Sequence, residues 1–106
     1  MVIPSGQLGA IAEVRGEGKL YGTVKFYPVP RGTLVAAEFA GLPDNGLCWL
    51  HLHAGTSAPL QSKNGRAFLA VETAGIQAWD LQGKRVALFL GSTQGQSIGS
   101  GQVEKL

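Results

Sequence analysis

Short apolar runs that alternate with polar residues, separated by glycine-rich breaks, most constrain how this chain can fold. The run from Leu20 to Tyr27 is the clearest case, because its apolar and polar residues fall on opposite sides of an extended strand. Six further segments are predicted to be strands: 8–14, 33–40, 47–53, 66–73, 84–90 and 97–105. No segment shows a sustained helical period of 3.6 residues. The pattern therefore predicts an all-β protein, an antiparallel sandwich or barrel.

The breaks between these segments carry residues that favour turns. Glycine accounts for 16 of the 106 residues, where the average is about 7%. Residues 28–32 contain two prolines and predict a break, because proline does not fit inside a central strand. Asn64-Gly65 suits a tight hairpin. Residues 54–62 are expected to form an irregular loop, and residues 74–83 fit a loop, a short strand or one helical turn.

Length and charge exclude several classes of protein. A chain of 106 residues predicts one domain, residues 1–106. The net charge of +2 comes from nine basic and seven acidic residues that are scattered along the chain, so neither nucleic acid nor an anionic membrane surface is an expected partner. No apolar run approaches the ~18 residues of a membrane helix. Without a visible signal peptide, and with a single cysteine, the chain is expected in the cytoplasm.

Two histidines are the candidate metal ligands. His51 and His53 are the only histidines of the chain, and they are two residues apart on a predicted strand. Residues so placed project from one face, about 6.5–7 Å apart at Cα, so their imidazoles can bind one copper or zinc ion. Two histidines without a ligand, facing solvent or partly packed, remain the alternative. Cys48 falls on the opposite face with Leu50 and is expected to be a buried, unreactive thiol.

Several segments resemble the Cu/Zn superoxide dismutase family. Residues 41–53, Gly-Leu-Pro-Asp-Asn-Gly-Leu-Cys-Trp-Leu-His-Leu-His, are similar to the turn and strand that bring two copper ligands into that family's site. Residues 22–26, 81–89 and 97–103 resemble other strands of the family, and all four segments occur in the family's order. The resemblance implies a Greek-key β-sandwich or barrel of seven to eight antiparallel strands, with His51 and His53 as metal ligands.

The chain departs from the family at the positions that matter for catalysis. The family uses four histidines for copper, and three histidines with an aspartate for zinc, one histidine being shared. Here Phe89 stands at a copper-ligand position, Ser97 at the position of the arginine that attracts superoxide, and Ser100 at a disulfide cysteine. Residues 54–62, the shortened loop, contain no His, Asp, Glu or Cys. We therefore expect no catalytic residues and no efficient dismutase activity in a single chain.

A homodimer could supply the metal ligands that a single chain lacks. A homodimer that set both histidine pairs face to face would offer four imidazoles to one ion. Trp49 and Phe89, expected on the same exposed face, would favour such burial because aromatic residues are enriched in interface cores. The main alternative is a non-catalytic interaction domain that uses this Trp49/Phe89 face for self-association or for a protein partner. A small-molecule site on the same face is a third possibility, and shortened loops that cover both aromatic rings are a fourth.

Overall fold

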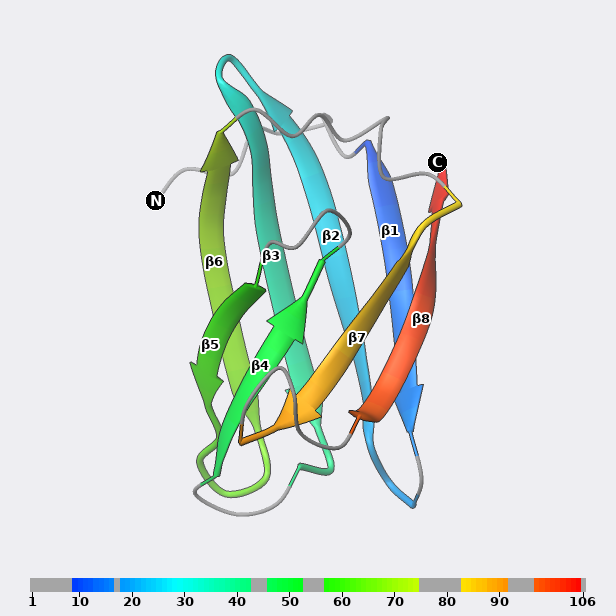
Figure 1. Cartoon of the computed structure of the whole chain (residues 1–106), viewed down its shortest axis with the longest axis vertical. Coiled ribbons are helices and arrows are strands. Elements are labelled where there is room, and N and C mark those ends of the chain that lie inside the picture. The colour runs from blue at the N-terminus through cyan, green and yellow to red at the C-terminus, as the bar shows by residue number, and fades with distance from the viewer. Residues whose placement is uncertain are drawn as a thin grey trace.

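The computed structural model describes residues 9–16, 18–42, 46–52, 57–74, 83–91 and 97–105. These residues form eight antiparallel β-strands and no helix (Figure 1). The strands are β1 (Ala10–Gly16), β2 (Tyr21–Val29), β3 (Gly32–Ala40), β4 (Leu47–His51), β5 (Ser57–Gln61), β6 (Ala67–Ala74), β7 (Arg85–Leu90) and β8 (Ser97–Lys105). The all-β prediction is confirmed. Within the described ranges there is no helix of the length and apolarity needed to cross a membrane.

The strand order makes the sheet a nearly closed barrel with Greek-key connections. Hydrogen-bonded neighbours follow the order β5-β4-β7-β8-β1-β2-β3-β6. The two end strands, β5 and β6, are consecutive in sequence and lie beside each other, so the sheet curls almost into a closed barrel (Figure 1). After β4, β5 and β6, the chain crosses back and places β7 beside β4. This return is the Greek-key arrangement, as expected.

The core consists of the inward-facing residues of the strands. The alternation predicted for the strands is confirmed, because the residues assigned to one side are buried and their neighbours are not. The largest fully buried side chains of the core include Phe26, Leu50, Leu52, Leu88, Val14, Val24, Val35, Val86 and Val103. Burial of apolar surface on this scale is the main force that holds the barrel together.

A glycine allows close packing in the last strand. Gly99 and Gly101 weaken the strand pattern of residues 97–105, yet these residues form β8, which pairs with β1 and β7. A Cβ atom added at Gly101 would collide with the backbone oxygen of Glu13 on β1. Glycine at this position therefore permits an approach of the two strands that any side chain would prevent.

Two of the predicted breaks between strands differ from the structure, and the strand predicted over 47–53 ends at His51. Residues 57–61 form β5 rather than an irregular loop. Ala58 and Leu60 are buried while Pro59 between them is exposed. The proline and the shortness of the run hide this alternation. Proline is tolerated there because β5 is an edge strand. The break predicted at residues 28–32 is shorter than expected, since β2 continues through Pro28 to Val29.

The predicted hairpin between β5 and β6 is confirmed. Lys63 and Arg66 exchange two backbone hydrogen bonds of 2.7 and 3.1 Å. Between them, Asn64 and Gly65 both have positive φ, 55° and 78°. Such angles are typical of a type I′ turn, which Asn-Gly favours. The turn fixes where β6 starts relative to β5.

Leu88 and Leu90, two residues apart on β7, test the core assignment. Leu88 is fully buried, whereas Leu90 is 38% exposed. We expect Leu88→Ala to lower the free energy of unfolding by about 2–5 kcal/mol, because it leaves a cavity. The same truncation at Leu90 should cause a clearly smaller loss. Denaturant unfolding measures both, and equal losses would contradict the assignment.

Candidate functional site on the outer face of strands β4, β5 and β7

The candidate site lies outside the barrel, on β4 and its two neighbours. Cys48 and Leu50 of β4 face the core, so Trp49 and His51 face outward and are partly exposed. Register places residues of β5 and β7 directly beside them on the same side. We call this surface the β4 face. It consists of Trp49, His51, Ser57, Pro59, Ala87 and Phe89.

His51 is held by one polar and one aromatic neighbour. Its Nδ1 lies 3.0 Å from Oγ of Ser57 on β5. On the other side, the ring of Phe89 meets the imidazole edge-on, with centroids 6.1 Å apart and an interplanar angle of 86°. In the tautomer with hydrogen on Nδ1, the ring donates to Ser57 and the Nε2 lone pair is left for another ligand.

Trp49 is anchored beside this histidine. Its indole Nε1–H donates to the backbone oxygen of Gly91 at 3.1 Å, and the backbone N–H of Gly91 donates to the oxygen of Leu47 at 2.9 Å. Trp49 is also the cross-strand partner of Phe89. The rings of Trp49 and Phe89 therefore lie on neighbouring strands of the same face, as the sequence predicted. The two hydrogen bonds of Gly91 hold the end of β7 against β4.

The structure tests the predicted ligand pair only in part. His51 lies on the outer face, as expected, but His53 falls outside the described residues, and its pairing with His51 stays a prediction. Within the described ranges, no group of three or more His, Cys, Asp or Glu residues could hold a metal ion. Cys48 is buried on the opposite side of β4 from His51, and burial raises the pKa of its thiol. Its predicted burial is confirmed.

One residue of the site was not found from the sequence. Ser57, the hydrogen-bond partner of His51, belongs to the segment that was expected to be an irregular loop. The alternation of Ala58 and Leu60 was the available signal, since it places Ser57 on the outer side of a strand. Even so, the pairing of His51 with Ser57 depends on the register between β4 and β5, which the alternation alone does not set.

The three single positions that depart from the superoxide dismutase pattern lie on β7 and β8, the strands that follow β4 in the sheet. Phe89 contacts the ring of His51, and Ser97 of β8 is the cross-strand partner of Phe89. Ser100 pairs with Ala87, which in turn pairs with His51. Comparison of the chain with models of known protein families, and with curated protein sequences, finds no match. The functional argument therefore depends on this geometry and on the sequence resemblance.

The raised pKa of the buried Cys48 thiol makes the free energy of unfolding depend on pH. Its thiol has a pKa above the ordinary value of 9.0 in the folded protein. Above that ordinary value, the unfolded chain loses the thiol proton before the folded one does, so the unfolded state binds fewer protons. The free energy of unfolding should therefore fall as pH rises through this range.

Denaturant unfolding at a series of alkaline pH values measures this dependence. Cys48→Ala is the control, because it removes the titrating group while other alkaline titrations remain. Its free energy of unfolding is expected to fall less steeply with pH than that of the original protein. Identical slopes for the two proteins would show that the thiol is not buried in the core.

Proposed function

We propose that the protein is a divergent relative of the Cu/Zn superoxide dismutases that keeps the β-barrel, binds copper or zinc through His51 and His53, and has no efficient dismutase activity. The observation that carries the proposal is the orientation of His51 on the β4 face by Ser57. The Greek-key barrel of eight strands also supports it, since the sequence resemblance implies this fold.

The surroundings of His51 suit a metal ligand. Histidines that bind metals usually donate their second ring N–H to an oxygen nearby, which fixes the tautomer and orients the ring. The Ser57 hydroxyl can take this role at Nδ1 and leave Nε2 for the ion. Neutral imidazole is a good ligand for both copper and zinc. Phe89 and Trp49 beside the ring would limit the access of water to one side of the ion.

The donor set does not suit dismutation. A copper ion that cycles between two oxidation states needs ligands that hold both states and still leave a position for superoxide. With two imidazoles as the protein ligands, most coordination positions of the copper ion are left to water, and water is a weak ligand. Phe89 offers an apolar ring where the resemblance implies a third imidazole, and Ser97 has no charge to attract an anion. A positive charge at such a site can raise the association rate of an anion by about 10–10³-fold, and this chain lacks that charge at Ser97. A homodimer would double the number of imidazoles.

A second candidate function rests on the aromatic residues of the same surface. Trp49 and Phe89 are partly exposed, Pro59 is exposed beside them, and Leu47 at the start of β4 is 43% exposed. Such a cluster is typical of the cores of protein interfaces. A non-catalytic interaction domain that uses this face for self-association or for a partner is therefore the alternative to metal binding.

Metal titration of protein without an affinity tag separates these functions. We expect copper to quench Trp49 fluorescence in a saturable way, measured in a Trp79→Phe background so that one indole reports. His51→Ala and His53→Ala should abolish saturation, because each removes half of the donor set. Ser57→Ala should weaken binding by about 10–100-fold, as loss of a partner that orients a ligand does.

Ser100→Ala is the matched control, because its hydroxyl bonds Arg85 on β7 rather than His51. It should bind copper like the original protein. Unchanged affinity in both histidine variants would refute metal binding at this pair and leave the interaction domain. A superoxide assay of the metal-loaded protein is expected to show little or no activity, and efficient turnover would contradict the proposal.

A further inference from the structure

Strands β5 and β6 separate beyond the turn that joins them. Lys63 and Arg66 pair at the turn, but the two strands stand at opposite ends of the strand order, so the described residues form no further ladder between them. If the register of the turn continued, Ala58 of β5 would lie opposite Val71 of β6. Ala58 has only a methyl group as its side chain, so it leaves space in front of Val71.

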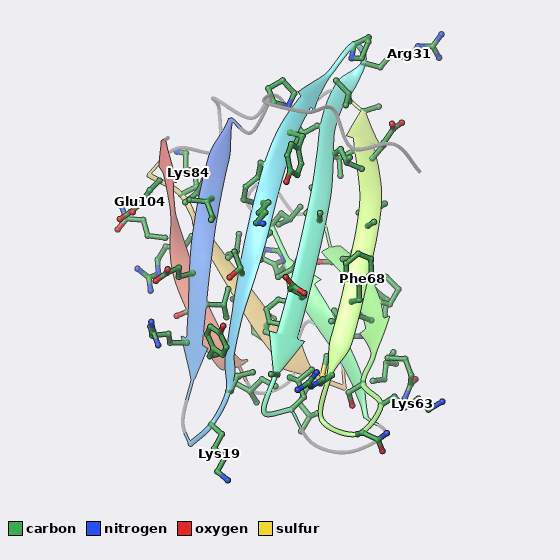
Figure 2. All side chains as sticks on the ribbon, turned by 180° about the vertical axis from the view of Figure 1, so that it is seen from behind. Lys19, Arg31, Lys63, Phe68, Lys84 and Glu104 are labelled. Carbon is green, nitrogen blue, oxygen red and sulfur yellow. The ribbon has the colours of Figure 1, made fainter. Side chains whose placement is uncertain are left out.

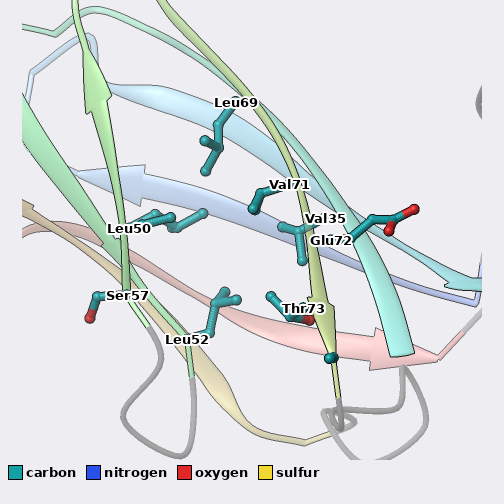
Figure 3. Close-up of a pocket in the computed structure, with 10 residues that line it drawn as sticks. Val35, Leu50, Leu52, Ser57, Leu69, Val71, Glu72 and Thr73 are labelled. Atoms are coloured by element: carbon teal, nitrogen blue, oxygen red, sulfur yellow. The ribbon is translucent and has the colours of Figure 1, made fainter. Parts of the chain in front are cut away.

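An apolar cavity of about 320 Å³ occupies this space between the two strands. Figure 3 shows Leu50 and Leu52 on one side of it and Leu69 and Val71 of β6 on the other. The first two leucines are fully buried, whereas Leu69 and Val71 face inward but are only partly buried. Phe68 lies on the outer side of β6, where its ring is 68% exposed (Figure 2). The half-covered side chains of β6 therefore leave the cavity open to solvent at the seam.

The polar side chains around the cavity either have partners or point away from it. The Thr73 hydroxyl donates to the backbone oxygen of Thr33 at 3.3 Å, and the Ser57 hydroxyl lies against His51 on the outer face. Glu72 is exposed and extends away from the cavity (Figure 3). A polar group placed deep in the cavity would therefore be buried among hydrocarbon side chains, at a cost in free energy.

The opening of the cavity is more polar than its interior. Among the described strands, β6 pairs only with β3, so alternate backbone N–H and C=O groups of β6 point toward the gap instead. Water can satisfy such groups at the edge of a sheet, and a hydroxyl group of a ligand can replace that water. The site therefore suits a molecule with an apolar body and one polar end.

We propose that this cavity binds an aliphatic molecule with a polar group at one end only, such as a medium-chain alcohol. Pockets for small molecules have volumes of about 300–1,000 Å³ and mostly apolar walls, and the mouths of β-barrels are among their usual places. The volume here is about twice that of a ~150 Å³ cavity that binds benzene, which gives room for a chain of about eight carbons. The site lies inside the barrel and does not depend on the function proposed for the β4 face.

Two alcohols of equal chain length test the proposal. We expect n-octanol, titrated below its solubility limit, to shift the methyl NMR signals of Leu69 and Val71 in a saturable way. The octanediol with a hydroxyl at each end should bind more weakly by about tenfold or more, because its second hydroxyl would be buried without a partner.

Variants that fill the cavity should lose this binding. Ala58 faces inward and is 9% exposed, so Ala58→Leu extends into the space from β5. Val71→Phe does so from β6. Each should weaken binding of n-octanol by about tenfold or more, since the alcohol would then overpack the cavity. Denaturant unfolding should show Ala58→Leu to be at least as stable as the original protein, because filling a cavity stabilises the fold.

Ala70→Leu is the matched control, because it makes the same enlargement on the outer side of β6, and it should bind n-octanol like the original protein. Four results would each overturn the proposal. They are the absence of saturable shifts, undiminished affinity in both cavity-filling variants, an octanediol that binds as tightly as n-octanol, and shifts centred on Trp49 and Phe89, which would place the alcohol on the β4 face.

Discussion

The burial of Cys48 and Leu50 in the core determines the position of the whole candidate site. Alternate residues of a strand face opposite sides, so these two inward side chains force Trp49 and His51 outward. A slip of one residue would bury the imidazole and expose Leu50. That slip would be costly because Leu50 is fully buried. Truncation of a buried leucine lowers the free energy of unfolding by about 2–5 kcal/mol, and exposing Leu50 would cost a similar amount. The orientation of the histidine is thus a consequence of core packing.

The neighbours of His51 come from the strands on the two edges of β4, one near in sequence and one distant. Ser57 reaches the imidazole through the β4–β5 pairing, and Phe89 through the β4–β7 pairing. The first pair is local, whereas the second needs the Greek-key return that brings β7 back to β4. The polar contact therefore follows from one hairpin, while the aromatic contact depends on the complete barrel. Partial unfolding that released β7 would remove Phe89 and leave the bond to Ser57.

The sequence predicted those parts of the fold that alternation controls. It placed His51 and Trp49 on one face and Cys48 on the other, because period-2 burial needs no knowledge of the partner strands. It missed β5, since a five-residue edge strand with a central proline resembles a loop. It also missed the contact of His51 with Ser57, which depends on register between strands. Strand order follows from long-range pairing, and only the family resemblance pointed toward a Greek key.

Ser57 connects the candidate site on the β4 face with the seam between β5 and β6. Its hydroxyl lies against His51, and the same residue borders the cavity at the seam between β5 and β6. A metal ion on His51 would restrict β5 through this hydrogen bond, and whatever restricts β5 at the seam would act on the oxygen that orients the imidazole. Linkage requires that such an influence be equal in both directions. The short edge strand that the sequence pattern hides is therefore the element through which the seam and the metal site would affect each other.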